Sequence, residues 1–151
     1  MGFFDKIFGK KNSINQHENK KEDKSKQIDI DYQNKLFATK EFYPFEKWRD
    51  NYSLGLTQYT EENCNKIKKV FDDLITSLIE IGKNASEAQK IKLFQTAILK
   101  TNQINEETGD LIETGEREEI CELTNKITVA CGLDPQKYGD GEGMASEWRE
   151  W

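Results

Sequence analysis

The most constraining feature of this sequence is an apolar pattern that repeats every three or four positions between residues 60 and 82. Its members are Cys64, Ile67, Phe71, Leu74, Leu78 and Ile81, with Ile75 and Ile79 widening the stripe. This spacing places the apolar side chains on one face of an α-helix. Thr60 precedes the pattern and suits a helix N-cap, and Gly82 follows it and suits a C-terminal stop. The pattern therefore predicts one long amphipathic helix.

A second helix is expected directly after the first. Ser86 and Gln89 form a capping-box pattern. The apolar residues that follow at helical spacing are Ile91, Phe94, Ile98 and Ile104. Because the link between the two helices is only a few residues long, the helices should be antiparallel neighbours.

A third helix is predicted from about Glu116 to Cys131. Three acids stand in its first turn, where the helix dipole favours negative charge: Glu116, Glu118 and Glu119. The residues expected to point inward are Ile120, Leu123 or Thr124, Ile127 and Cys131. Gly132 and Pro135 close the helix.

Two further segments are expected to be short helices at the ends of the domain. In the aromatic segment 35–56, Pro44 can open a helix whose one face carries Phe45, Trp48 and Tyr52. This helix is expected to pack across the end of the bundle, with an aromatic ligand cage as the alternative.

The C-terminal segment 144–151 carries Met144, Trp148 and Trp151 at positions i, i+4 and i+7. A helix there would put all three on one face, and burying both indoles would contribute several kcal/mol at about 25 cal/mol per Å². A structural role in closing the core is the favoured interpretation, and an exposed hook for a partner is the alternative.

The sequence thus predicts an all-α fold: an antiparallel helical bundle of three main helices, with short accessory helices at the start and at the C-terminus. The bundle domain is expected to cover residues 35–151. Residues 1–34 are expected to form an amphipathic tip and a flexible basic and polar linker.

The amphipathic tip carries Phe3, Phe4, Ile7 and Phe8 at helical spacing, followed by two lysines. This pattern suits weak contact of residues 2–11 with an anionic membrane surface. It also suits a peptide that docks on a groove of a partner or of this chain, and the remaining alternative is a frayed N-terminus without such a role. Residues 10–31 contain no large apolar cluster and are expected to be disordered.

Charge is unevenly distributed along the chain, whose formal net charge is −6. Residues 101–151 hold thirteen acids and four basic residues. Such a surface repels phosphate backbones, which argues against nucleic-acid binding, and it attracts basic proteins. The candidate partner-binding residues are Glu113, Glu116, Asp140 and Glu142.

Catalytic, metal and cofactor sites are not predicted. The single histidine, His17, stands in the polar linker, where a catalytic Ser–His or Cys–His pair is not expected. Three cysteines without a C-x-x-C pair suit neither a disulfide scaffold nor a zinc site, so they are expected to be small buried hydrophobes in a reducing cytosol. Phosphate-binding glycine motifs are also missing. The sequence does not indicate an oligomeric state.

The segment from Leu111 to Ile120 (LIETGEREEI), the Gly132–Asp134 turn (GLD) and the terminal EWREW resemble small, helical, uncharacterised bacterial proteins. These domains of unknown function share an E-T-x-x-R-E helix start and a terminal R-x-W, and the resemblance covers residues 40–151. It implies fold-defining contacts for the matching positions, which are Glu113, Thr114, Arg117, Trp148, Arg149 and Trp151. Some proteins of this kind are immunity partners of polymorphic toxins.

Together these observations predict a non-enzymatic, cytosolic protein-binding module, of the immunity or regulatory kind, that occludes a basic partner. The alternative is a peripheral scaffold that its N-terminal tip anchors at the inner membrane surface.

Overall fold

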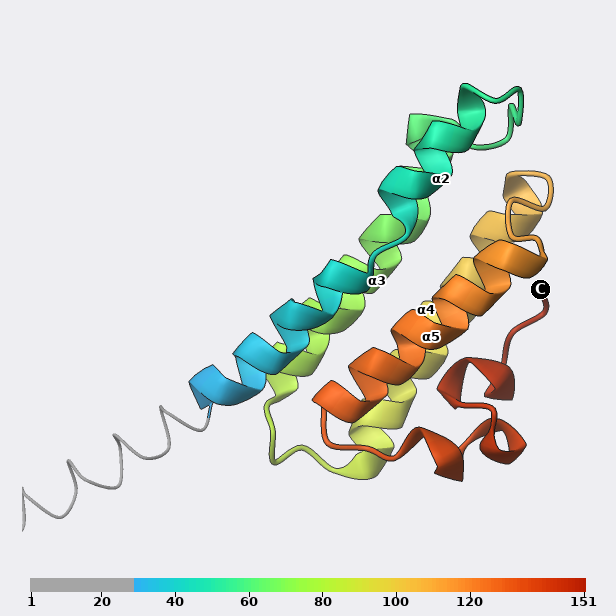
Figure 1. The fold of residues 1–151 in the computed structure, drawn as a ribbon. Coiled ribbons are helices and arrows are strands. Elements are labelled where there is room, and N and C mark those ends of the chain that lie inside the picture. The colour runs from blue at the N-terminus through green and yellow to red at the C-terminus, as the bar shows by residue number, and fades with distance from the viewer. Residues whose placement is uncertain (1–28) are drawn as a thin grey trace, which may run out of the picture. The chain divides into compact units, whose positions relative to one another are not determined.

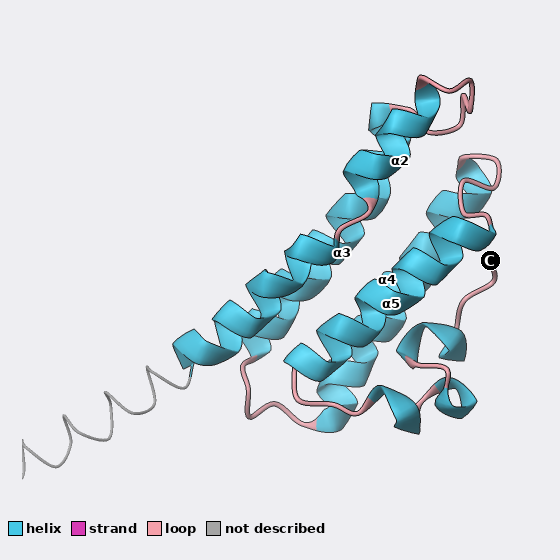
Figure 2. Ribbon diagram, in the orientation of Figure 1, coloured by secondary structure: helices cyan, strands magenta, loops and turns pink. Residues whose placement is uncertain are grey.

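A computed structural model describes residues 29–151, and the regular elements in this part of the chain are all helical (Figures 1 and 2). The compact unit considered below is Tyr32–Trp151. The all-α class is confirmed for these residues. The predicted tip and most of the predicted linker lie outside the described residues.

Three long helices form the bundle: α3 (Glu61–Ile81), α4 (Glu87–Glu107) and α5 (Thr114–Ala130). Figure 1 shows that successive helices run in opposite directions, and α3 packs along α4. The loop 82–86 joins α3 to α4, and the loop 108–113 joins α4 to α5. The predicted antiparallel pairing of the first two helices is therefore confirmed.

The predicted helix ends follow the expected hydrogen bonds. The Asn63 backbone N–H donates to Thr60 Oγ1 at 3.1 Å. The Gln89 N–H donates to Ser86 Oγ at 3.2 Å, while the Ser86 N–H donates back to Gln89 Oε1 at 3.0 Å. Gly82 ends α3 with a φ of 82°, a left-handed conformation that glycine adopts without a steric cost. These caps fix where α3 and α4 begin and where α3 ends.

The N-terminal part of the domain lies along α3, not across the end of the bundle as predicted. Residues 32–38 are helical and lead through the 3₁₀ turn η1 (Thr39–Phe42) into α2 (Phe45–Tyr52), which packs on α3 (Figure 1). Phe45 and Trp48 are fully buried and meet edge to face at 5.3 Å. These rings pack on one another and on α3, so they belong to the core and do not form an open aromatic cage.

The start of the helical domain lies earlier than the predicted residue 35. Tyr32 is buried, and its hydroxyl donates to the Leu78 carbonyl oxygen at 3.1 Å. Leu36, one turn later, is also fully buried. Two apolar side chains one turn apart thus attach this helix to α3, although the surrounding sequence is polar.

The buried residues of α3 differ from the predicted apolar stripe at two positions. Val70 is buried, whereas Ile81 is exposed because it stands in the last turn, beside the C-cap. The predicted inward residues of α5 are all buried, as are Cys64 and Cys131. Cys121 is half-buried.

The predicted C-terminal helix over 144–151 is wrong. Only the 3₁₀ turn η4 (Met144–Glu147) forms, after two other short turns, η2 (Pro135–Lys137) and η3 (Gly139–Gly141). The side chain of Asn102 on α4 donates to the Trp148 carbonyl oxygen at 2.8 Å and accepts from the Glu150 N–H at 3.1 Å. These bonds satisfy the terminal backbone groups in a non-helical conformation.

Candidate functional site

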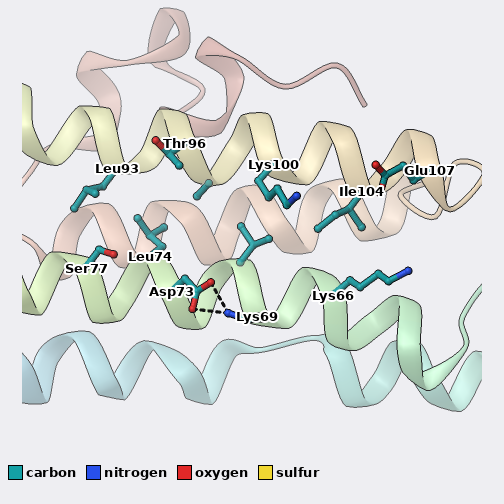
Figure 3. Close-up of a pocket in the computed structure, with 12 residues that line it drawn as sticks. Lys66, Lys69, Asp73, Leu74, Ser77, Leu93, Thr96, Lys100, Ile104 and Glu107 are labelled. Atoms are coloured by element: carbon teal, nitrogen blue, oxygen red, sulfur yellow. Dashed lines mark hydrogen bonds and ion pairs between the residues drawn. The ribbon is translucent and has the colours of Figure 1, made fainter.

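A groove of about 470 Å³ runs between α3 and α4 (Figure 3). Its floor is apolar and comes from both helices: Val70, Leu74, Leu93, Ala97 and Ile104. Val70, Leu74, Ala97 and Ile104 are buried, so the floor of the groove consists of core side chains of the two helices. We call this feature the α3–α4 groove.

The edges of the α3–α4 groove carry three lysines, Lys66, Lys69 and Lys100, together with two acids. Lys69 pairs with Asp73 at 2.8 Å and Lys66 pairs with Glu62 at 3.2 Å, both between neighbouring turns of α3. Exposed pairs of this kind contribute only about 0–1 kcal/mol. The lysines therefore remain available to another anion.

A second candidate surface forms where α4 ends and α5 begins. Residues 105–122 contain eight acids and one arginine. We call the following group the acidic end: Glu106, Glu107, Asp110, Glu113, Glu116 and Glu118. The loop 108–113 brings these residues to one end of the bundle, at the top of Figure 1.

Several carboxylates at or near the acidic end make hydrogen bonds and ion pairs within the domain. Glu119 accepts from the Trp48 indole N–H at 2.6 Å and also pairs with Lys47. Glu116 accepts from the Glu113 backbone N–H at 3.2 Å. Burial, followed by a hydrogen bond with Glu116, raises the pKa of Tyr59. Glu116, one of the predicted partner-binding residues, is thus partly committed to internal contacts.

Other carboxylates of the acidic end have no role in holding the described part of the fold together. Glu106, Asp110 and Glu118 are exposed and make no side-chain hydrogen bond or ion pair within residues 29–151. Glu106 and Glu107 also stand in the last turn of α4, which contains no basic residue. Acids at a helix C-terminus oppose the helix dipole, so these side chains do not favour folding.

Exposed apolar side chains lie at the same end of the bundle. The α2–α3 loop presents Leu54, which is 78% exposed, and Leu56, which is 43% exposed. The same loop leads into Tyr59, whose contact with Glu116 places it beside the start of α5. The acidic end therefore adjoins the exposed apolar side chains of the α2–α3 loop, Leu54 and Leu56.

The structure does not bring the four predicted partner-binding residues together. Glu113 and Glu116 stand at the start of α5, whereas Asp140 and Glu142 belong to the C-terminal turns. Gly143, which follows Glu142, lies against Asn125 in the second half of α5. The two pairs are thus separated by about 14 Å along α5, at 1.5 Å per residue. Glu142 also pairs with Arg149 at 3.8 Å.

The residues implicated by the resemblance lie in the C-terminal segment and at the start of α5. Trp148 and Trp151 are half-buried and pack against the core. The Arg149 guanidinium donates to the Trp151 carbonyl oxygen at 2.7 Å and lies 5.8 Å from the centre of the Trp151 ring. Arg117 is half-buried and forms no ion pair within residues 29–151. Thr114 is exposed in the first turn of α5.

The three cysteine thiols are not activated for nucleophilic chemistry. Burial raises the pKa of the Cys64, Cys121 and Cys131 thiols, to about 11 at Cys131. A raised pKa reduces the thiolate fraction at neutral pH. Residues 29–151 contain no group of three or more His, Cys, Asp or Glu side chains placed to hold a metal ion. None of the helices in this region is long and apolar enough to span a membrane.

Neither a protein-family model, a curated protein nor a solved structure matches this chain.

Proposed function

We propose that this chain is a non-enzymatic protein-binding module that holds a basic partner at its acidic end. The observation that carries the proposal is a set of exposed carboxylates, without side-chain partners within residues 29–151, beside the exposed leucines of the α2–α3 loop. Glu106, Asp110 and Glu118 supply the charge, and Leu54 and Leu56 supply the apolar contact. Apolar centres with charged surroundings are typical of protein–protein interfaces.

The charge conflict in α4 supports the same proposal. Two glutamates oppose the dipole at the C-terminus of α4, at a cost of about 0.3–1 kcal/mol each. A local arrangement that opposes folding is more typical of a binding surface than of a structural one. A basic partner would neutralise these charges and accelerate association through electrostatic steering.

The resemblance to small bacterial helical proteins extends the proposal to an immunity or regulatory role in the cytosol. In that role the module would cover a functional surface of its partner. Asp140 and Glu142 would contribute as a second acidic contact, since they lie farther along α5. Their contribution is expected to be smaller because Glu142 is paired with Arg149.

The experiment that tests this function compares two charge variants in affinity capture from a lysate of the cell that produces the protein. The acidic-end variant carries Glu106→Lys, Asp110→Asn and Glu118→Lys. Asparagine is chosen at position 110 because Asp110 has a φ of 61°, which asparagine tolerates better than lysine.

The control variant carries Glu41→Lys, Glu80→Lys and Glu150→Gln, all at exposed positions outside the acidic end. Both variants raise the formal net charge from −6 to −1. A basic protein that wild type and control capture at low salt, and that the acidic-end variant does not, is the expected result. Equal capture by both variants would reject the acidic end as the binding surface.

A second candidate function rests on the sequence of the N-terminal tip. Phe3, Phe4, Ile7 and Phe8 with the adjacent lysines suit weak binding to an anionic membrane surface. Deleting residues 2–11 should then abolish sedimentation of the full chain with vesicles of phosphatidylserine and phosphatidylcholine. Unchanged sedimentation without these residues would exclude the tip as an anchor.

A further inference from the structure

The α3–α4 groove differs in charge from the rest of this acidic protein. Its lining contains three lysines and two acids, whereas the whole chain has a formal net charge of −6. Figure 3 shows the lysine side chains at the edges of the groove and the apolar side chains between α3 and α4. An apolar floor with cationic edges is chemically complementary to an amphipathic, anionic segment.

The shape of the groove favours an elongated occupant. Its lining extends over residues 66–77 of α3 and 93–107 of α4. At 1.5 Å per residue these stretches are about 16 and 21 Å long, which matches three to four turns of a docked helix.

Small side chains line the end of the groove nearest to the α3–α4 loop. Ser77 on α3 and Thr96 and Ala97 on α4 line this end together with Leu93. Because these side chains are short, a third backbone can approach the two helices closely. Leu74 and Val70 then provide the apolar contacts along the floor.

The lysines at the edges are weakly held in the free protein. Beyond the two pairs within α3, the Lys100 ammonium donates to Gln103 Oε1 at 3.3 Å, a long hydrogen bond to a neutral group. The Lys66 and Lys69 side chains are 44% and 73% exposed. All three ammonium groups can therefore turn to carboxylates of an incoming segment at little cost.

We propose that the α3–α4 groove binds an amphipathic helix of a partner protein, with apolar residues on the floor and Asp or Glu at the lysine edges. The recognition mode is a helix in a groove, in which residues at i, i+3 or i+4, and i+7 anchor the segment. This inference does not depend on the acidic end, because the two surfaces differ in charge and share only Glu107.

The test selects binders from a display library of helical 18-residue peptides against the full chain. The library varies the apolar stripe and the charge of the flanking positions. Enriched peptides are then synthesised with a fluorescent label, and their affinity is measured by anisotropy. The expected result is an apolar stripe with spacing of three and four and flanking Asp or Glu.

Matched variants locate the site. The edge variant carries Lys66→Gln, Lys69→Gln and Lys100→Gln, and its control carries Lys35→Gln, Lys92→Gln and Lys137→Gln, which are exposed positions elsewhere. Both variants lower the formal net charge from −6 to −9. The edge variant should bind the selected peptides about tenfold more weakly, because three charge pairs of modest strength are lost. The control should bind them like wild type.

A second pair of variants fills the groove without changing charge. Ala97→Leu extends a side chain into the groove, and Ala88→Leu makes the same change at an exposed site on α4. Ala97→Leu should abolish peptide binding while the helical content stays near that of wild type, which shows that the variant is folded. Ala88→Leu should bind normally.

Three results would overturn the proposal. They are a selection that returns no binders, a selection that returns binders with basic flanks, and peptides whose affinity is insensitive to both Ala97→Leu and the edge variant. Sedimentation of the free chain provides a further criterion: a dimer that Ala97→Leu dissociates would assign the groove to a second copy of this chain.

Discussion

Replacing Glu119 by alanine should destabilise the domain far more than replacing its neighbour Glu118. Trp48 is fully buried, and its indole N–H donates to Glu119 Oε2 at 2.6 Å. Without the carboxylate, this donor stays in the core with no acceptor. Glu118 is exposed and makes no side-chain contact of this kind within residues 29–151.

The magnitude follows from the burial of the donor. A hydrogen bond to a charged acceptor contributes about 1.5–3 kcal/mol, and an unsatisfied buried donor costs about as much. The pair between Glu119 and Lys47 adds little, because the lysine side chain is 74% exposed. Glu119→Ala should therefore lower the free energy of unfolding by about 2–3 kcal/mol and the melting temperature by about 6–12 °C.

The assay is urea unfolding of the full chain followed by far-UV circular dichroism, with thermal unfolding as a second measure. Glu118→Ala is the matched control, since it makes the same change one position away and should stay within about 0.5 kcal/mol of wild type. Glu119→Gln keeps an oxygen acceptor and should fall between the two. If Glu119→Ala is as mild as Glu118→Ala, the hydrogen bond between Trp48 and Glu119 does not hold α2 against α5.

Three other perturbations have defined outcomes. Gly143→Ala should lower the free energy of unfolding by at least about 1–3 kcal/mol, because Gly143 has a φ of 112° and an added Cβ would lie 2.1 Å from Asn125 Oδ1. A melting temperature like that of wild type would contradict this close approach. Replacing Glu106 and Glu107 together by glutamine should stabilise the domain by about 0.6–2 kcal/mol at low salt, and a gain that persists in concentrated salt would argue against a dipole effect. Burial raises the pKa of Tyr32 to about 12 from about 10 in the unfolded chain, so the free energy of unfolding should fall as the pH rises from 10 to 12. Tyr32→Phe should show a shallower fall in that pH range, and an unchanged slope would rule out Tyr32 as its source.

Helix positions were predictable from the sequence because they depend on local chemistry. The repeat of apolar residues and the caps at Thr60, Gly82 and Ser86 act within a few residues of one another. The structure places α3 and α4 at these boundaries. The start of α5 at Thr114 differs from the predicted Glu116 by two residues, a common error at a helix end.

The failed predictions involve contacts between residues far apart in the sequence. Asn102 binds the backbone of residues 148 and 150, and no local pattern shows that an asparagine on α4 would prevent a terminal helix. Tyr32 belongs to the core because of its contact with Leu78, 46 residues away. Local composition instead suggested a linker in that region.

The candidate sites were only partly predictable for the same reason. Charge composition identified the acidic region, but it did not separate Glu116 and Glu119, which serve Tyr59 and Trp48, from the exposed Glu106 and Glu118. The α3–α4 groove depends on which faces of two helices meet. The spacing of Lys66, Lys69 and Lys100 on amphipathic helices is the sequence signal that would have indicated its cationic edges.

The most direct test of the acidic end is the affinity of the captured basic partner, purified and titrated against wild type and the acidic-end variant at two salt concentrations. Wild type should bind more tightly and lose affinity as salt rises, whereas the acidic-end variant should bind more weakly and depend less on salt. Equal affinities and equal salt dependence for the two proteins would contradict the assignment of the acidic end as the partner-binding surface.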